Sequence, residues 1–283
     1  MSVGIVGLGL IGGSFARAVQ AYTEHRVYGL DTEEVLAAAR ADGVIAGTLT
    51  PERLGQVDVL ILCLYPGQIV EFLQQNAAGI APGTLVFDCA GVKEPVCAAA
   101  FPLARVHGFD FLGGHPMAGI EKSSYRWSRQ DLFQGASMIF VPPDGADAAL
   151  QRASDFVRRL GFGRVTVTTA GHHDQVIAYT SQLAHVVSSA YIKSPTAASF
   201  AGFSAGSFRD MTRVAFLNAD MWTELFLDNR GPLQQEIEGI IGQLRAFSEA
   251  LRAGDAAQLH ALLQDGREKK IQTDALLQSD AAC

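Results

Sequence analysis

The sequence has few cysteines, no excess of basic residues and no long apolar run, and each shortage excludes a class of protein. Four cysteines, Cys63, Cys89, Cys97 and Cys283, form no CxxC pair and show no spacing typical of a disulfide framework, so we expect reduced thiols. With 22 Lys and Arg against 29 Asp and Glu, the formal net charge is −7. This acidic balance argues against a nucleic-acid binder, which would need a basic face to neutralise the phosphates, so we predict no nucleic-acid partner.

No segment predicts a membrane span or a signal peptide. The longest apolar stretch, residues 57–65, contains Asp58 and is far shorter than the ~20 residues that a spanning helix needs. The first residues are apolar and rich in glycine, but they lack a basic n-region. We expect a cytoplasmic protein with no membrane partner. The length of 283 residues, with 48% hydrophobic and 18% charged residues, favours a globular chain of two domains.

The first ~168 residues alternate short β-rich runs with alanine-rich helical stretches such as 33–41 and 146–160. This alternation predicts an α/β domain with a mostly parallel, Rossmann-like sheet and crossover helices. The predicted strands are 3–6, 26–30, 57–64, 84–88, 109–113, 137–141 and 164–168.

The pattern of the remaining residues predicts helices only. We therefore divide the whole chain into an α/β domain, 1–169, and a helical domain, 170–283. The junction between them is short, which favours two domains that share a cleft. The clearest helix carries one apolar stripe, which predicts either the core of the helical domain or the interface of a homodimer. Its members are Leu233, Ile237, Ile240, Leu244, Phe247 and Leu251.

A glycine-rich turn near the N-terminus predicts a dinucleotide site. Residues 7–12 match GxGxxG, follow a predicted strand and open a predicted helix. Gly7 permits the tight turn, Gly9 lets the backbone approach a pyrophosphate, and Gly12 allows close helix packing. The N-terminus of the helix supplies N–H donors and the positive end of its dipole to the phosphates.

The end of the second predicted strand indicates which dinucleotide binds. Asp31 lies 19 residues after Gly12, where a carboxylate bonds the ribose hydroxyls of NAD. The same carboxylate would repel the 2′-phosphate of NADP, and the next residue is Thr32 rather than arginine. We predict NAD as the cofactor and no metal. The residues predicted to bind it are Gly7, Gly9, Leu10, Ile11, Gly12 and Asp31.

His115 is a candidate general base. It lies in FLGGHPMAG, at the carboxyl end of a predicted strand, and ligands of open α/β sheets bind outside those ends. The ordinary pKa of histidine is close to working pH, which suits proton transfer. By position alone, a loop histidine that precedes a turn proline fits equally well.

The segment 172–185, HHDQVIAYTSQLAH, predicts a helix with two distinct faces. One face is small and polar and includes Ser181 and His185, which fits the wall of a cleft or a solvated surface. The predicted apolar stripe on the other face is Val176, Thr180, Leu183, Val187 and Ala190.

Two arginines near one aspartate, Arg209 and Arg213 beside Asp210, predict a second polar cluster. One arginine would be structurally paired and the other would bind a carboxylate in bidentate fashion. A pair of surface arginines is the alternative.

Several motifs in order along the chain resemble the prephenate dehydrogenase family, which comprises the cyclohexadienyl and arogenate dehydrogenases of tyrosine biosynthesis. The motifs are GLGLIGGS, DCAGVK, GGHPMAGIEKS, HD…SQLAH and FRDMTRVA…MW…FLDN. The resemblance runs from residue 3 to about residue 245. It implies a dinucleotide-binding N-terminal domain and a helical C-terminal domain that forms a homodimer.

The resemblance also implies roles for single residues. His115 matches the catalytic histidine that accepts the proton of the substrate's ring hydroxyl, and His185 matches a second histidine in the substrate cleft. Arg213 matches the arginine that binds a substrate carboxylate. The other residues implied to contact the substrate are Ser181, Trp222 and Glu121.

Two positions depart from the family pattern. Gly91 stands where the family usually carries a serine that hydrogen-bonds near the catalytic histidine, so a water or another hydroxyl must replace that bond or the step is slower. Gln182 stands where some relatives carry a histidine.

The activity that the resemblance implies is the NAD-dependent oxidative decarboxylation of prephenate, a small-molecule substrate. We expect prephenate because no further acidic residue of the motifs is clearly placed to hold the ammonium of arogenate, with Glu121 as the one candidate. The alternatives are an arogenate dehydrogenase and a dual-specificity cyclohexadienyl dehydrogenase. More distant ones are a two-domain dehydrogenase of 2- or 3-hydroxy acids, which typically uses a lysine, and a non-catalytic NAD-sensing module.

Overall fold

The computed structural model describes residues 1–120 and 122–281, and only the backbone of 277–281. By its internal contacts the chain forms two units, Met1–Pro232 and Leu233–Cys283, which are described separately. The domain boundary predicted at 169/170 follows the last strand and lies inside the first unit. That boundary stays a prediction.

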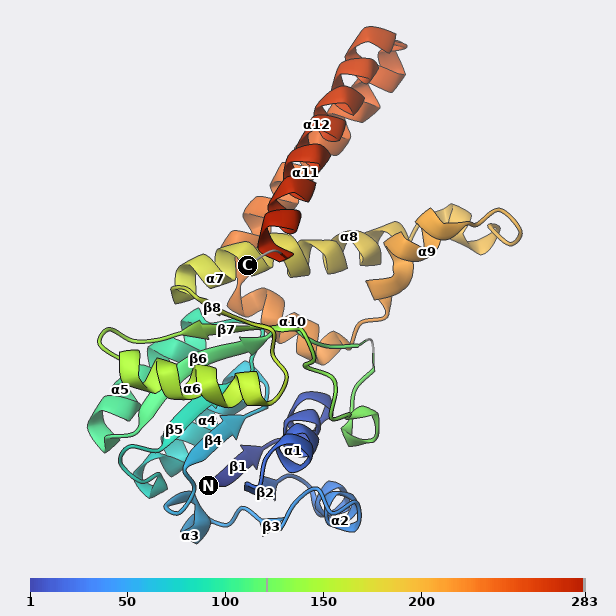
Figure 1. Ribbon diagram of the computed structural model, residues 1–283. Coiled ribbons are helices and arrows are strands. Elements are labelled where there is room, and N and C mark those ends of the chain that lie inside the picture. Colours follow the sequence, from blue (N-terminus) through green and yellow to red (C-terminus); the bar gives the residue numbers. More distant parts are fainter. Residues whose placement is uncertain (121, 282–283) are drawn as a thin grey trace. The chain divides into compact units, whose positions relative to one another are not determined.

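In the described residues, eight strands form one sheet in the order β3-β2-β1-β4-β5-β6-β7-β8 (Figure 1). All neighbouring strands are parallel except β6 and β7, so the predicted mostly parallel Rossmann-like sheet is confirmed. The strands are β1 (Ser2–Val6), β2 (Arg26–Leu30), β3 (Gly47–Thr48), β4 (Val59–Leu62), β5 (Leu85–Asp88), β6 (Asp110–Pro116), β7 (Ser137–Val141) and β8 (Arg164–Val167).

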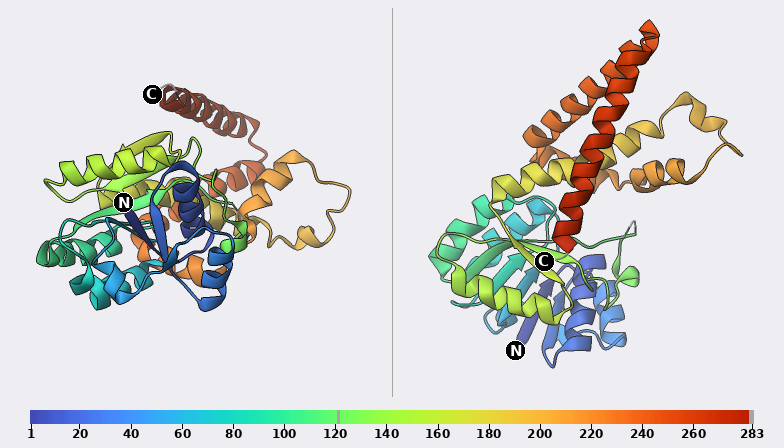
Figure 2. Two further views of the ribbon diagram at one scale, coloured as in Figure 1. Left: turned by 60° about the horizontal axis from the view of Figure 1, so that its bottom comes forward. Right: turned by 45° about the horizontal axis from the view of Figure 1, so that its top comes forward.

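Helices cover both faces of this sheet, as the left view of Figure 2 shows. Alternate residues of a strand therefore enter two different apolar cores: Val59 and Ile61 of β4 enter one, and Leu60 and Leu62 enter the other. Burial on both faces explains why the strands are continuous apolar runs. The covering helices are α1 (Leu10–Tyr22), α2 (Glu33–Ala41) and α6 (Asp147–Arg159) on one core, and α3 (Pro51–Leu54), α4 (Pro66–Asn76) and α5 (Glu94–His107) on the other.

The rest of the first unit is helical. A π-helical turn, η3, joins α7 to α8 (Figure 1). A π turn adds a residue per turn and rotates the faces of the helix that follows it. The elements are α7 (Ala170–Ile177), η3 (Ala178–Leu183), α8 (Ala184–Tyr191), α9 (Gly206–Thr212) and α10 (Ala219–Asp228), with two short 3₁₀ turns, η4 (Pro195–Ala198) and η5 (Arg213–Ala215). Two further 3₁₀ turns, η1 (Ala77–Gly79) and η2 (Tyr125–Trp127), lie in the α/β part of the unit.

The apolar stripe predicted for this helical segment is largely wrong. Val176 is 41% exposed and Thr180 and Ala190 are also exposed, although Leu183 is buried. The buried face includes the polar side chains of His173 and Asp174, which are hydrogen-bonded to each other, so a search for apolar periodicity does not select it.

The second unit consists mainly of α11 (Arg230–Ala253), whose first residues belong to the first unit, and α12 (Ala256–Ala281). In the predicted stripe of α11, Leu233 is 4% exposed, but Leu244 is 61% and Leu251 is 65% exposed. The stripe is therefore covered at its start, half-buried at Ile237, Ile240 and Phe247, and open to solvent at Leu244 and Leu251. Among the described residues, no helix has both the length and the apolar character needed to cross a membrane.

Candidate active site

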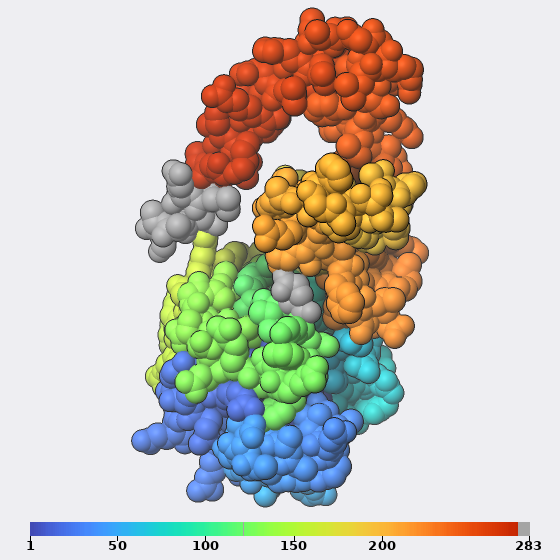
Figure 3. Space-filling model, turned by 90° about the vertical axis from the view of Figure 1, so that its right-hand side faces the viewer, coloured from blue at the N-terminus to red at the C-terminus, as the bar shows by residue number. Residues whose placement is uncertain are grey.

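A cavity of about 970 Å³ lies at the carboxyl edge of the parallel strands. Its lining comes from the segments that follow β1, β4, β5 and β6 and from η3, α8, η5 and α10. It includes the crevice between β1 and β4, where the strand order reverses and where open α/β sheets bind their ligands. Figure 3 looks onto a face of the first unit on which the loop after β6 (green) lies between the first helices (blue) and the residues around 195–215 (gold).

The glycine turn has the geometry that a dinucleotide needs. Gly7 has a φ of +85°, and a Cβ on it would lie 2.4 Å from the carbonyl oxygen of Cys63. A Cβ on Gly12 would lie 1.8 Å from the carbonyl oxygen of Gly7, whereas nothing lies within 4 Å of a Cβ on Gly9. Gly9 thus leaves the backbone open to the cavity at the start of α1, where a pyrophosphate fits. Gly12 lines the cavity as well, and so do the predicted residues Leu10 and Ile11.

Asp31 follows β2 and braces the glycine turn. Its Oδ2 accepts a hydrogen bond from the backbone N–H of Leu8 at 2.6 Å, and its Oδ1 accepts one from Thr32 N–H at 2.7 Å. Asp31 and Gly7 do not line the cavity themselves. The open Gly9, the helix N-terminus and this carboxylate together fit a dinucleotide with an unphosphorylated ribose.

A hydrogen-bonded series of two histidines and one carboxylate leads away from the cavity. His115, at the end of β6, lines the cavity, and its Nδ1 lies 2.9 Å from Nε2 of the buried His173 on α7. His173 Nδ1 lies 2.6 Å from Oδ1 of Asp174. The Asp174 carboxylate also accepts hydrogen bonds from the backbone N–H groups of Lys93 at 2.7 Å and Glu94 at 2.8 Å, at the start of α5.

These hydrogen bonds fix the tautomer of His115. A carboxylate that accepts two backbone N–H bonds is an acceptor only, so Nδ1 of His173 must be the protonated nitrogen. Nε2 of neutral His173 is then an acceptor, and His115 donates to it from Nδ1–H. His115 Nε2 therefore carries a lone pair and can act as the base.

Burial keeps both histidines in their neutral forms. Desolvation lowers the pKa of His115 well below 6.5, and the positive charge of Lys93 lowers it further. Desolvation also lowers the pKa of His173, although its hydrogen bond to Asp174 acts in the opposite direction. His115 is thus ready to accept a proton at neutral pH.

A buried ion pair supports the strand that carries His115. The side chains of Lys93 and Asp88 are both 0% exposed, and Lys93 Nζ donates to Asp88 Oδ2 and, at 2.6 Å, to the carbonyl oxygen of Gly114. Asp88 Oδ1 accepts the N–H of Gly114 at 2.9 Å. Both backbone groups next to His115 are thereby held in place.

The predicted substrate residues that the structure describes meet on the other side of the cavity. Ser181, His185, Arg213 and Trp222 all line it. His185 Nδ1 donates to the carbonyl oxygen of Ser181 at 2.8 Å, and its ring lies 4.0 Å from that of Trp222. Burial lowers the pKa of His185, opposed by the Ser181 carbonyl and aided by the charge of Arg213. The fifth predicted residue, Glu121, lies outside the described residues.

The structure shows what surrounds Gly91 and Gln182, the two departures from the family pattern. A Cβ on Gly91 would lie 3.3 Å from Leu225 Cδ2, so the missing side chain leaves little empty space. Gln182 is 2% exposed, donates to the carbonyl oxygen of Leu225 at 3.2 Å and accepts from Asn229 Nδ2 at 2.8 Å. Gln182 is therefore a structural tie between η3 and α10.

Sequence reasoning assigned no role to His173, Asp174, Asp88 or Lys93. All four lie inside motifs that were recognised, namely HD and DCAGVK. The available signal was a charged or titratable residue inside an otherwise apolar stretch, because such residues are buried only when they are paired.

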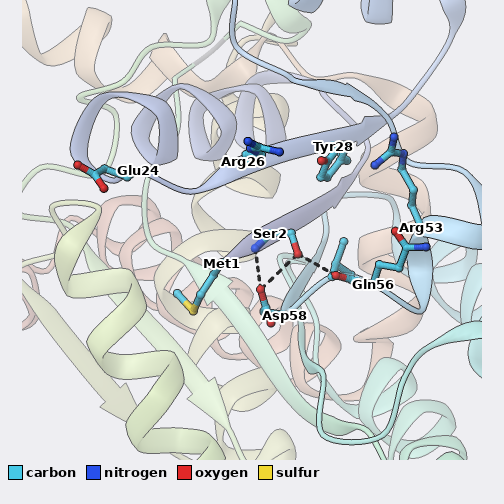
Figure 4. Close-up of a pocket in the computed structure, with 9 residues that line it drawn as sticks. Met1, Ser2, Glu24, Arg26, Tyr28, Arg53, Gln56 and Asp58 are labelled. Atoms are coloured by element: carbon cyan, nitrogen blue, oxygen red, sulfur yellow. Dashed lines mark hydrogen bonds between the residues drawn. The ribbon is translucent and has the colours of Figure 1, made fainter.

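A second cavity, of about 420 Å³, lies at the opposite, amino edge of the sheet (Figure 4). Three of its polar residues, Ser2, Gln56 and Asp58, are joined by hydrogen bonds. Ser2 N–H donates to Asp58 Oδ2 at 2.6 Å, and Ser2 Oγ donates to the carbonyl oxygen of Gln56 at 2.8 Å. This edge lacks the glycine turn and the histidines. Within the described part of the chain, no three side chains of His, Cys, Asp or Glu come together as metal ligands.

A doubly wound sheet with an open glycine turn and a neutral histidine in one cavity defines the class of dinucleotide-dependent oxidoreductases. The comparison with known proteins narrows this class. The family model "Prephenate dehydrogenase, nucleotide-binding domain" matches residues 15–167, and the model "Prephenate dehydrogenase, dimerization domain" matches residues 169–265. The chain belongs to the prephenate dehydrogenase family and is an NAD-dependent oxidoreductase, as its motifs predicted.

Individual relatives agree over nearly the whole chain. The chain is 27% identical to a prephenate dehydrogenase of Lactococcus lactis over 275 residues, which covers 93% of this chain and 75% of the relative. It is 28% identical to a cyclohexadienyl dehydrogenase of Zymomonas mobilis over 285 residues, with 95% and 94% covered. The crystal structure of prephenate dehydrogenase from A. aeolicus in complex with hydroxyphenyl propionate and NAD+ aligns with a TM-score of 0.81 and 27% identity, over 96% of this chain and 98% of that one.

Proposed function

We propose that the protein converts prephenate to 4-hydroxyphenylpyruvate by NAD-dependent oxidative decarboxylation, in tyrosine biosynthesis. The observation that carries this proposal is the hydrogen-bonded chain from His115 through His173 to Asp174, which leaves His115 Nε2 as a neutral base in the cavity that the glycine turn also lines. Relatives that match nearly the whole chain support the same substrate class.

In the proposed reaction, His115 Nε2 takes the proton of the ring hydroxyl of the substrate. When bound by residues 9–12 and Asp31, NAD would accept the hydride from the carbon that bears this hydroxyl. The resulting ketone is conjugated to the carbon that bears the ring carboxylate, so carbon dioxide leaves and the ring becomes aromatic. The charge that His115 gains is stabilised by its Nδ1–H bond to His173 and, through it, by Asp174.

The charges of the cavity favour an anionic substrate. Among the described residues that line it, the permanently charged ones are Lys122 and Arg213, and none is acidic. We assign Arg213 to a substrate carboxylate, with Ser181, His185 and Trp222 beside it. Prephenate carries two carboxylates and no ammonium, whereas the side chain of arogenate also carries an ammonium that this wall would disfavour.

The deciding experiment is an NADH-formation assay with prephenate and arogenate side by side, each with NAD and NADP. We expect faster turnover of prephenate and at least about a tenfold preference for NAD in kcat/KM, which requires only ~1.4 kcal/mol. Faster turnover of arogenate would reverse the choice of substrate and point to Glu121. Equal use of NAD and NADP would contradict the role of Asp31.

We further propose a cytoplasmic homodimer that forms through the helical C-terminal segment. The support is the exposure of five large apolar residues on α11 and α12, together with the match to a dimerization-domain model. Light scattering at micromolar concentration should give about twice the chain mass of 30.2 kDa. A monomer at that concentration would contradict the proposal. The exposed residues are Leu244, Leu251, Leu263, Ile271 and Leu276.

A further inference from the structure

Two cysteines lie side by side in the floor of the cavity. Cys63 follows β4 and Cys89 follows β5, directly after the paired residues Leu62 and Asp88. Their Sγ atoms are 3.6 Å apart, and both residues line the cavity. Neighbouring strands of a sheet lie ~4.8 Å apart, which is within the Cα separation that a disulfide spans.

The two thiols differ in their surroundings. The pKa of the Cys89 thiol is raised well above 9.0, first by burial and then by its contact with Cys63. Both thiols are half-buried and line the cavity, so a small oxidant can reach both. The raised pKa of the Cys89 thiol leaves Cys63 as the sulfur that is oxidised first. The third described cysteine, Cys97, is 2% exposed and lies outside the cavity, under Gly113.

We propose that Cys63 and Cys89 are a reversible oxidation site, at which a peroxide converts the pair to a disulfide and thereby weakens NAD binding. In the first step, the Cys63 thiolate attacks the peroxide, breaks its O–O bond and becomes a sulfenic acid, while the peroxide is reduced to water or an alcohol. In the second step, the Cys89 sulfur displaces hydroxide from the Cys63 sulfur, and water leaves. The effect on NAD rests on the proposed cofactor site.

The link to NAD binding is steric. The Sγ atoms must close from 3.6 Å to about 2.05 Å, so one or both residues must move. Cys63 is packed against the glycine turn. Its Cβ lies 3.1 Å from the position of a Cβ on Gly12, and its carbonyl oxygen lies 2.4 Å from that of a Cβ on Gly7. A shift of Cys63 therefore displaces the backbone that holds the pyrophosphate. Bound NAD would in turn cover the cavity and slow the oxidation.

To test the proposal, the protein is treated with hydrogen peroxide and its remaining thiols are alkylated. The alkylated thiols and the disulfides are then mapped by mass spectrometry. We expect a disulfide between Cys63 and Cys89, a rise in the dissociation constant of NAD by about fivefold or more, and full reversal by dithiothreitol. Saturating NAD, added before the peroxide, should slow formation of the disulfide.

The controls compare oxidised and reduced samples of each variant. Cys97→Ala should respond as the wild type does, whereas Cys63→Ser and Cys89→Ser should lose the reversible change in NAD affinity. Oxidation of Cys63 to a sulfinic acid with the Cys89 thiol intact, or a disulfide that leaves NAD affinity within about twofold, would overturn the proposal. Failure of the reduced protein to bind NAD would instead overturn the proposed function, because the disulfide is mapped independently of activity.

Discussion

At the scale of single residues, the site is organised around the protonation of one imidazole. Asp174 can only accept, His173 therefore donates to it, and His115 donates to His173. The nearby charge of Lys93 and the burial of the ring keep the pKa of His115 low. Burial and the charge of Lys93 both favour the neutral form of His115, so the imidazole is ready to take a proton without a prior rearrangement.

Replacement of His115 by Asn should lower kcat by roughly 10²–10⁴, the range for loss of a general base. The amide keeps a similar size, so NAD affinity should stay within a few-fold. Stopped-flow and steady-state assays with prephenate would measure both. Near-normal kcat with an unchanged pH profile would make His185 the next candidate for the base.

His173→Gln should lower kcat by about 10- to 100-fold without a large change in KM, because His173 positions the base and touches no substrate. Because His173 is the hydrogen-bond partner of His115 Nδ1, its replacement should also shift the acid limb of the kcat profile. The matched control is His172→Gln, which changes the exposed residue next to it. An unshifted pH profile in His173→Gln would reduce the residue to a packing role.

Arg213→Ala should mainly raise the KM for prephenate, because a carboxylate contact made in both the ground and the transition state is uniform binding. Loss of a charge-assisted contact is worth ~2–4 kcal/mol, or roughly 30- to 1,000-fold. NAD affinity should change little. Arg105→Ala, on the outer side of α5, is the control for general charge effects. A normal KM in Arg213→Ala would place the carboxylate site elsewhere.

At the scale of elements, local sequence patterns predicted most strands and helices, whereas contacts between residues far apart in the sequence could not be predicted from such patterns. Strands 26–30 and 137–141 were predicted with the bounds of β2 and β7, because each is a short β-rich run. β3 has only two residues, Gly47 and Thr48, and no apolar pattern. The partner of His115 lies 58 residues further along the chain, and no local periodicity reports such a contact.

The join between η3 and α10 depends on Asn229, which is 2% exposed and donates to the carbonyl oxygen of Asp174 and to Gln182 Oε1, both at 2.8 Å. Asn229→Ala leaves two buried acceptors without this donor, so the free energy of unfolding should fall by about 1–3 kcal/mol. Denaturant titration measures this loss. The comparison is Asn76→Ala, whose amide caps only its own helix. An equal loss of unfolding free energy in the two variants would contradict a special contribution of the buried Asn229 hydrogen bonds.

At the scale of the whole molecule, burial of histidines couples stability to pH. The pKa values of His25, His115, His173 and His185 are all lowered from 6.5, with burial as the largest cause. Below pH 6.5 the unfolded chain therefore binds more protons than the folded chain, and the free energy of unfolding must decrease as pH falls.

Urea denaturation between about pH 7.5 and 5 should show this decrease, with a plateau above the ordinary histidine pKa. The sign follows from the depressed pKa values: the stabilisation is complete above 6.5 and is lost as each folded-state pKa is approached from above. His173→Gln should flatten the slope, whereas His172→Gln should not. Stability that rose on acidification would contradict the buried, neutral state of these rings.

The hydrogen-bond chain also has a consequence for the order of synthesis. The glycine turn and His115 leave the ribosome well before Asp174, and Trp222 follows later still. The predicted domain 1–169 contains the turn, but in a nascent chain that ends after β8 its histidine lacks the partner that sets the tautomer, and the cavity lacks its helical wall. We therefore expect the growing polypeptide to acquire a dinucleotide pocket first, and a catalyst only after residues 170–229 have been translated and have docked.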